Sequence, residues 1–194
     1  LGTGGLFRAN ATHAQAVNDR WAYKVSAGFF SMDAVPRPTG TIPVDPGRGT
    51  GGAPYPPFEN DGTVQPKFNI RVDYDNPDGR QKWIVEGGFG GTEGIIHTGI
   101  GPFQVERGSR VGFAKVNYLR DNWKVNFFAN LVDIDSPALL AIGVDGQPLD
   151  FLFNSQTYDV EVGDSQTLGT KHLVTYGGNL RFTAFDLSIA PGDD

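Results

Sequence analysis

Cysteine is absent from this 194-residue chain, so disulfides, thiolate nucleophiles and cysteine-based zinc or iron–sulfur centres are excluded. No run of apolar residues approaches the roughly 20 that a membrane-spanning helix needs. Positive charge is also scarce: the net charge is −6 and the pI is near 5.0, which argues against a nucleic-acid-binding protein. A signal peptide and an initiator methionine are missing, since the chain opens with Leu1-Gly-Thr-Gly-Gly, and we expect a part of a longer protein.

Glycine, by contrast, is abundant, and it is concentrated in the segment GGFGGTEGIIHTGIGPF at residues 87–103. A phosphate-binding loop would need a lysine here, and a dinucleotide fingerprint would need a third glycine after Gly99 and Gly101; both are missing. We interpret the segment as a strand end followed by an outer loop, where glycine permits backbone conformations that other residues avoid. Its one imidazole, His97, is a candidate ligand contact.

Catalytic and metal-binding motifs are missing as well. The chain has neither Gly-x-Ser-x-Gly nor His-Glu-x-x-His, and its acidic residues between 133 and 164 lack the spacing of a calcium-binding EF-hand. Asp73 and Asp75 alternate on one strand face beside Arg71, as charges facing a water-filled interior would. We therefore expect no enzymatic activity, no metal and no cofactor, and a catalytic pair assembled across strands stays an alternative.

Period-two alternation of apolar and polar residues is the strongest pattern in the chain. Within residues 122–134, Trp123, Val125 and Phe127 fall on one face, while Lys124 and Asn126 fall on the other. The same pattern predicts strands at Arg20–Ser31, Lys67–Asn76, Arg80–Gly90 and Leu173–Phe182. Strands of about ten residues match the ~9–11 that cross a bilayer at a tilt better than the ~5–6 of an average strand. One apolar face and one charged face suit a wall between lipid and water.

Two segments depart from this pattern. Val111 and Phe113 change face relative to Val116 and Tyr118, which predicts a β-bulge within residues 109–120. Residues Ser136–Val144 favour a single helical turn inside a loop. No other segment indicates a helix.

Long and short connections alternate along the chain. Loops of about 35 residues are expected at Met32–Pro66 and Asp135–Gly169, with the glycine-rich stretch Thr92–Gly108 between them. Tight turns are expected at Asp75–Gly79, Arg120–Asn122 and Thr183–Asp186. This alternation is typical of an antiparallel outer-membrane barrel, which has short periplasmic turns and long outer loops. Aromatic residues near the turns, such as Tyr118 and Trp123, would then form a girdle at the membrane surface.

Four segments carry a family resemblance: WAYKVSAGFF at 21–30, FNIRVDYDNPDGRQKWIVEGGFGGTEGIIHTGIGPF at 68–103, NYLRDNWKVNFFANLVDIDSPALLAIGVDGQPLDFLF at 117–153 and LVTYGGNLRFTAFDLSIAP at 173–191. They resemble the N-terminal half of the barrel in TonB-dependent outer-membrane receptors. The family's barrel has 22 strands, and we count about eight here, so residues 1–194 are expected to form one partial barrel domain. The family's plug domain and TonB-box segment would lie upstream.

The resemblance implies active uptake of a siderophore, cobalamin or glycan through the outer membrane of a Gram-negative bacterium. The implied partners are outer-membrane lipid, the TonB complex (through the plug) and a small nutrient such as a ferric siderophore. No catalytic residue, cofactor or nucleic acid is implied.

Candidate residues follow from position alone. Ligand contacts are expected in the outer loops, at His97, Glu106, Arg107, Tyr55, Phe58, Phe151, Phe153 and Tyr158. Residues expected to face the lumen are Arg71, Asp73, Lys124, Asn126, Asn130, Asn179 and Arg181.

Two alternatives stay open. One is a complete eight-stranded outer-membrane barrel, whose interior side chains can fill. The other is a soluble β-sandwich, such as a carbohydrate-binding module, with aromatic residues as sugar platforms. A soluble module would stay monomeric in plain buffer, whereas a piece of a receptor wall would need detergent.

Overall fold

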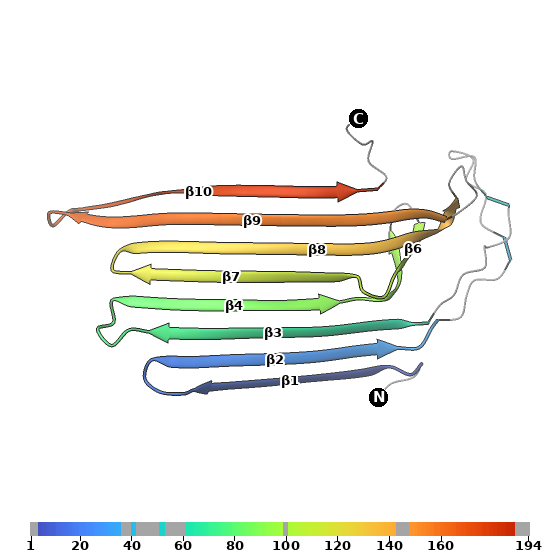
Figure 1. Cartoon of the computed structure of the whole chain (residues 1–194), viewed down its shortest axis with the longest axis horizontal. Coiled ribbons are helices and arrows are strands. Elements are labelled where there is room, and N and C mark those ends of the chain that lie inside the picture. The colour runs from blue at the N-terminus through green and yellow to red at the C-terminus, as the bar shows by residue number, and fades with distance from the viewer. Residues whose placement is uncertain are drawn as a thin grey trace.

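Ten β-strands are formed by the described residues of the protein in a computed structural model (Figure 1). The structure describes residues 4–35, 40–41, 51–52, 61–98, 101–142 and 148–188. The strands are β1 (Phe7–Ala16), β2 (Trp21–Met32), β3 (Thr63–Asp75), β4 (Gln81–Gly91), β5 (Gly94–Thr98), β6 (Gly101–Val105), β7 (Arg110–Arg120), β8 (Trp123–Ile142), β9 (Pro148–Leu168) and β10 (His172–Leu187). Within the described ranges the chain forms no helix that is long and apolar enough to cross a membrane.

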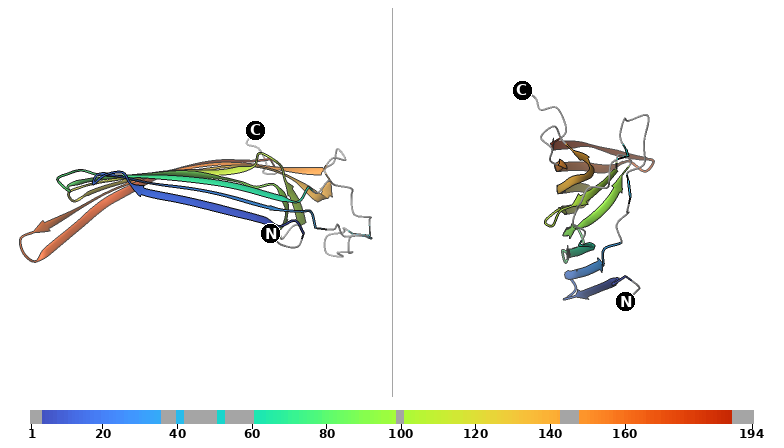
Figure 2. Two further views of the ribbon diagram at one scale, coloured as in Figure 1. Left: turned by 90° about the horizontal axis from the view of Figure 1, so that it is seen from below. Right: turned by 90° about the vertical axis from the view of Figure 1, so that its right-hand side faces the viewer.

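The strands form one antiparallel sheet in the order β1-β2-β3-β4-β7-β8-β9-β10, and the short β6 and β5 branch from the far end of β8. Figure 2 shows a single twisted layer whose outermost strands, β1 and β10, do not meet. The expected number of eight strands was therefore too low. The described residues form neither the two packed sheets of a sandwich nor a closed eight-stranded barrel.

One end of the sheet carries only short connections, at residues 17–20, 76–80, 121–122 and 169–171, and we call it the turn end. The opposite end carries the two long connections, at residues 33–62 and 92–109, together with the five-residue connection 143–147, and we call it the loop end. The predicted turn at Thr183–Asp186 is wrong, because β10 continues through it to Leu187. The predicted loop Asp135–Gly169 is also wrong. Most of it belongs to β8 and β9, which pair with each other from Trp123↔Asp164 to Pro137↔Asp150.

The predicted bulge within residues 109–120 does not form. β7 pairs with both β4 and β8 in an unbroken register, so Val111 and Phe113 lie on the opposite face from Val116 and Tyr118. The helical turn expected at Ser136–Val144 is replaced by the end of β8, which runs to Ile142; residues 143 and 144 lie outside the described residues.

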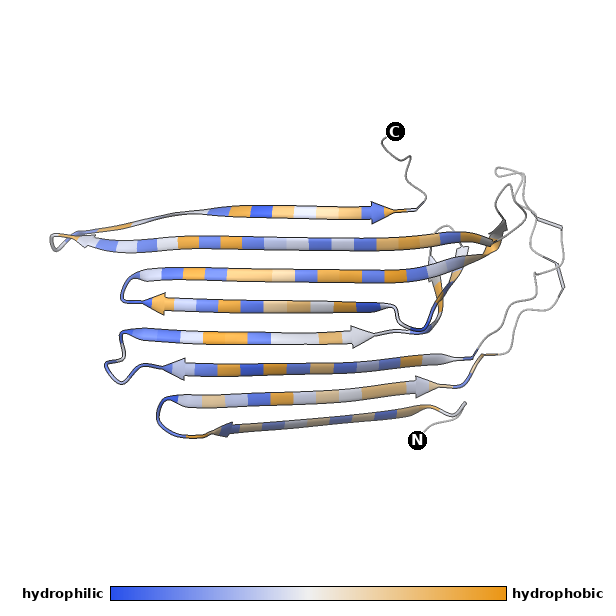
Figure 3. Ribbon diagram, in the orientation of Figure 1, coloured by the Kyte–Doolittle hydropathy of each residue, from blue (hydrophilic) through white to orange (hydrophobic). Residues whose placement is uncertain are grey.

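The cross-strand register extends the alternation of single strands into two faces (Figure 3). Trp21 lies beside Tyr74, Tyr74 beside Trp83, and Trp83 beside Tyr118. We call this side the apolar face; it carries Tyr23, Val25, Phe29, Phe68, Ile70, Val72, Val85, Phe89, Val116, Trp123, Val125, Phe127, Leu131, Val160, Val162, Leu180 and Phe182. We call the other side the polar face; it carries Lys24, Asn69, Arg71, Asp73, Glu86, Lys115, Asn117, Lys124, Asn126, Asn130, Asp159, Glu161, Asn179 and Arg181. The predicted separation of the two faces is confirmed.

Few side chains are buried, and most of these lie at the loop end. Phe103 and Val105 of β6 pack with Ala138 and Leu139 of β8, and all four are at most 9% exposed. Elsewhere the large apolar side chains are half-buried or exposed: Trp123 is 49% and Leu131 44% exposed. No second layer of described residues covers the apolar face.

Candidate functional site

A row of aromatic side chains crosses the apolar face near the turn end. The ring centroids of Trp21 and Tyr74 lie 4.6 Å apart, and those of Trp83 and Tyr118 lie 4.3 Å apart. Trp123, the first residue of β8 after the turn from β7, lies at the same end. Amphipathic rings of this kind are enriched where a protein surface passes from hydrocarbon to water. Tyr118 and Trp123, which are expected from the sequence to belong to such a girdle, both lie at this end of the apolar face.

From this row toward the loop end, the apolar face forms a band that covers only part of the length of each strand. It spans Trp21–Phe29 in β2, Pro66–Tyr74 in β3 and Trp123–Leu131 in β8. Each segment has about nine residues, which is close to the ~9–11 that a tilted strand uses to cross a bilayer. The strands themselves continue beyond the band, so their loop-end parts lie outside it.

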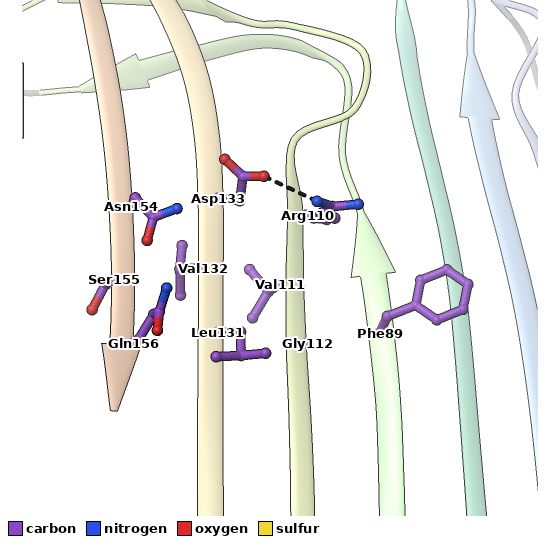
Figure 4. A pocket seen from close by; sticks show the side chains of 10 residues that line it. All are labelled: Phe89, Arg110, Val111, Gly112, Leu131, Val132, Asp133, Asn154, Ser155 and Gln156. Carbon is purple, nitrogen blue, oxygen red and sulfur yellow. Dashed lines mark hydrogen bonds and ion pairs between the residues drawn. The ribbon is translucent and has the colours of Figure 1, made fainter. Parts of the chain in front are cut away.

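A polar boundary closes the band toward the loop end (Figure 4). Nη2 of Arg110 lies 3.3 Å from Oδ2 of Asp133, directly beyond Leu131. A pocket of about 290 Å³ lies at this boundary, between Phe89 and Leu131 on one side and the polar Asn154 and Gln156 on the other. The change from apolar to ion-paired residues is therefore sharp along β7 and β8.

On the polar face, charged side chains are paired along and across the strands. Arg71 donates to both carboxylate oxygens of Asp73, at 2.8 and 2.7 Å. Nζ of Lys124 lies 3.5 Å from Oε1 of Glu161, whose other oxygen accepts from Nδ2 of Asn126 at 2.8 Å.

The same pairing continues at the β9–β10 edge. Asp159 accepts from Nδ2 of Asn179 at 2.9 Å and from Nε of Arg181 at 2.8 Å. All seven residues predicted to face a lumen (Arg71, Asp73, Lys124, Asn126, Asn130, Asn179 and Arg181) share this face.

Two buried acceptors on the polar face have no protein donor. Asn117 and Asn126 are direct cross-strand neighbours, and Oδ1 of each lacks a hydrogen-bond partner among the described residues. A buried acceptor without a donor costs free energy, so water or a bound molecule is expected to donate to this pair.

The glycine-rich stretch is a hairpin that continues β4 and β7 and bends away from the main sheet. Gly94 and Gly108 have φ of 133° and 106°, which other residues rarely adopt, at the points where β5 begins and where β6 leads into β7. Ser109, 5% exposed, anchors the bend: its Oγ accepts from the Asp135 backbone N–H at 3.1 Å and donates to the Asp135 carbonyl at 3.2 Å.

Arg107 holds the other side of the hairpin. Its guanidinium donates to both carboxylate oxygens of Glu93, at 3.0 and 3.2 Å, which raises the pKa of Arg107 above its ordinary value. The neighbouring Glu106 has an exposed side chain, and its backbone N–H donates to the Asp135 carbonyl at 2.8 Å. Arg107 is thus engaged within the protein rather than free for a ligand, while the Glu106 carboxylate faces solvent.

The remaining predicted ligand residues do not come together. Phe151, Phe153 and Tyr158 lie in strand β9, not in a loop. Phe151 packs on Phe103 with ring centroids 5.8 Å apart and beside Phe153 at 6.4 Å, whereas Tyr158 lies on the apolar face. Phe151 and Phe153 therefore belong to the small core beneath the hairpin. Tyr55, Phe58 and the side chain of His97 lie outside the described residues.

A cleft on the polar face was missed by sequence reasoning. It has a volume of about 520 Å³, lies at the loop end of β1–β4 and contains Arg8, Asn10 and Lys67. The signal that could have found it is Gly28, a glycine within an otherwise regular strand, since such a residue marks a close approach of a neighbouring group.

Neither a metal site nor a comparison with known proteins assigns a function to this chain. Within the described residues no group of three or more histidine, aspartate or glutamate side chains is placed to hold a metal ion. Comparison with protein-family models, curated proteins and solved structures found no match.

Proposed function

We propose that this chain forms part of the wall of an outer-membrane β-barrel and that the parent protein is a TonB-dependent receptor for a small nutrient. The observation that carries the membrane part is the apolar band, which is uncovered, about nine residues high and bordered by aromatic rings at one end and by an ion pair at the other. Such a band matches the hydrocarbon thickness that a barrel strand must cross.

The backbone supports the same proposal. In hydrocarbon every backbone N–H and C=O must be paired, which a sheet achieves only by closing on itself. The interior strands of this sheet are paired on both sides, while β1 and β10 each have one edge that no strand of the described residues pairs. Further strands of the parent protein would pair these edges and complete the wall.

The receptor part rests on the resemblance of four segments to this family. In the proposal, the turn end faces the periplasm and the loop end faces outward. The polar face lines an aqueous interior, where the paired charges contact water and a plug. Nutrient would enter at the loop end, and TonB would act through the plug.

The membrane proposal is tested by placing the same charge on either face of one strand. Val125 lies on the apolar face between Tyr118 and Val162, and Asn126 lies on the polar face beside Glu161. In refolding with phospholipid vesicles, Val125→Arg should lower the membrane-assembled fraction by at least about tenfold, since arginine at mid-depth costs ~2–4 kcal/mol. Asn126→Arg should assemble like the unaltered chain, because water and Glu161 accept its charge.

Vesicle flotation and far-ultraviolet circular dichroism would measure assembly. Equal tolerance of the two variants would contradict the proposal. So would a chain that stays monomeric and folded in plain buffer without binding vesicles, which is the behaviour of the soluble carbohydrate-binding alternative.

The receptor proposal has a separate test in the source bacterium. Deleting the gene should reduce growth when a ferric siderophore, cobalamin or a glycan is the limiting nutrient, and loss of TonB should reproduce the defect. Normal uptake of all three nutrient classes after deletion would leave a membrane wall without the proposed transport role.

A further inference from the structure

The cleft at the loop end of the polar face has the features of a binding site. It has a volume of about 520 Å³ and is formed by side chains and backbone of five strands, β1 to β4 and β7. The lining residues that the argument uses are Arg8, Asn10, Phe30, Gln65, Lys67 and Val111.

Glycines lie in and beside this cleft: Gly90 and Gly91 line it, and Gly28 lies next to it in β2. The register places Asn10, Gly28, Lys67, Gly90 and Val111 side by side in one row across the sheet. A Cβ atom at Gly28 would collide with Cε of Lys67 and lie 2.6 Å from Oδ1 of Asn10. The Lys67 side chain therefore lies across β2 toward β1, in space that only a glycine leaves open.

The cations of the cleft differ from several other cations on this face, which are paired with carboxylates. Arg71, Lys124 and Arg181 each lie within 3.5 Å of a carboxylate. In the part of the chain that the structure describes, Arg8 and Lys67 have no such partner. The cleft is therefore a place of uncompensated positive charge in a chain whose net charge is −6.

The rest of the lining adds both polar and apolar contacts. Nε2 of Gln65 donates to Oγ1 of Thr92 at 3.4 Å, so the amide is held at the rim and its carbonyl oxygen is free to accept. Phe30 and Val111 supply carbon surface beside the charges. Ligand sites commonly combine such apolar walls with a few convergent polar groups.

We propose that this cleft binds a small organic anion, with its carboxylate or phosphate between Arg8 and Lys67 and its apolar part against Phe30 and Val111. Anion binding does not depend on the membrane proposal, because it requires only that the polar face is open to water. That the anion is the imported nutrient rests on the proposed receptor function. A lipid headgroup is a less suitable occupant, because the cleft opens on the polar face and not on the apolar band.

The test uses 1-naphthoate as the anionic probe and 1-naphthylmethanol as its neutral counterpart. Reductive methylation with ¹³C labels the lysine amines while keeping their charge. The chain is held in whichever medium keeps it monomeric, plain buffer or a zwitterionic detergent. Naphthoate should shift the Lys67 resonance saturably, and naphthylmethanol should not. Lys24 and Lys115 lie on the same face outside the cleft and, among the described residues, also have no carboxylate partner; they serve as internal controls and should shift little.

Variants separate the charge from the shape of the cleft. Arg8→Gln should weaken naphthoate binding by about tenfold, as expected for losing a hydrogen bond to a charged group. Gly28→Ala should also weaken it without changing any charge, because the new methyl group displaces Lys67. Lys115→Gln removes one charge elsewhere on the face and should leave the affinity unchanged.

Three results would overturn the anion site: no saturable shift of Lys67, equal shifts at Lys24 and Lys115, or equal binding of naphthylmethanol. The outcome is separable from the membrane proposal. If the chain binds naphthoate in plain buffer but does not bind vesicles, the anion site stands and the membrane proposal fails. If the chain assembles in vesicles but does not bind naphthoate, the membrane proposal stands and the anion site fails.

Discussion

Gly87 and Gly88 are neighbours in β4 whose missing side chains would point to opposite faces of the sheet. A Cβ at Gly88 would lie 2.6 Å from the Phe68 carbonyl oxygen and 2.9 Å from Cε1 of Phe113, on the polar face. At Gly87 the nearest atom would be the Phe113 carbonyl oxygen, at an ordinary 3.4 Å. One glycine is thus required by packing, and its neighbour is not.

We predict that Gly88→Ala destabilises the folded chain by about 1–3 kcal/mol, the usual cost of overpacking. Gly87→Ala should be nearly neutral and is the matched control. Urea denaturation of both variants, in the medium that keeps the chain monomeric, measures the difference. Equal free energies of unfolding for the two variants would show that the sheet relaxes around Gly88.

Asp121 is a second residue with a local constraint. Its φ is 52°, in the left-handed region that aspartate and asparagine tolerate better than most residues. Its carboxylate accepts from Nε of Arg80 at 2.6 Å and from Nη2 at 3.0 Å, so it joins two neighbouring turns. These hydrogen bonds lower the pKa of Asp121 below its ordinary value.

Because the pKa of Asp121 is lowered in the folded chain, the Arg80–Asp121 pair contributes its full stability at pH values above the ordinary aspartate pKa of about 3.9. It is lost as the pH falls through the lowered value, because protonation removes the charge that Arg80 binds. Asp121→Asn keeps the left-handed preference and removes the titration. The unaltered chain should therefore be more stable than this variant near pH 6, and the difference should vanish in strong acid. A difference independent of pH would refute the role of the charge.

At the level of secondary structure, the bend of the β5–β6 hairpin depends on Ser109. The side chain of a second buried serine at the same corner, Ser136, makes no comparable hydrogen bonds with the described residues. Oγ of Ser109 makes two hydrogen bonds to the backbone of Asp135. Ser136 is only 2% exposed, and its Oγ has no partner among the described residues. The two serines thus differ in bonding, not in burial.

Ser109→Ala should cost about 1–3 kcal/mol, because it leaves the Asp135 N–H without an acceptor. Ser136→Ala should be neutral or slightly stabilising, since it removes a buried hydroxyl that no protein group satisfies. Thermal unfolding gives both values, and hydrogen exchange at the Asp135 amide locates the first effect. If Ser136→Ala were the more damaging change, an unseen partner of Ser136 would have to exist.

Which strands could be read from the sequence follows from where their residues lie. β3 and β8 were found because Val72 and Val125 belong to the apolar band and alternate with charged neighbours. The loop-end parts of β8 and β9 lie outside that band, where neither face needs to be apolar, so Phe151 was assigned to a loop. Backbone pairing between the two strands, rather than side-chain pattern, forms this part of the sheet. Tyr158 lies inside the band, opposite Ala129, and the alternation of Tyr158, Val160 and Val162 with charged neighbours was overlooked in the sequence.

For the whole molecule, the two unpaired edges decide its behaviour in isolation. β10 is exposed along almost its whole length, and Leu180 on its apolar face is 76% exposed. A long, exposed, apolar edge strand pairs readily with other chains. Isolated copies of this chain should therefore self-associate.

We predict that Leu180→Lys reduces this association several-fold, because charges on an edge strand oppose edge-to-edge pairing. Asn122→Lys adds the same charge in the turn between β7 and β8, away from both edges, and should have little effect. Sedimentation velocity at a fixed detergent concentration measures both. Equal suppression by the two lysines would indicate that net charge, and not the edge, controls association.

Local alternation was sufficient to assign an all-β antiparallel fold and to separate Val125 from Asn126, because the period of a strand sends successive side chains to opposite faces. Neither the limits of β9, nor the bend of the hairpin, nor the meeting of Arg8 with Lys67 could be derived that way. Each depends on register between strands that lie far apart in the chain. Hydrogen bonding between backbones sets this register, and it leaves no periodic mark on either segment alone.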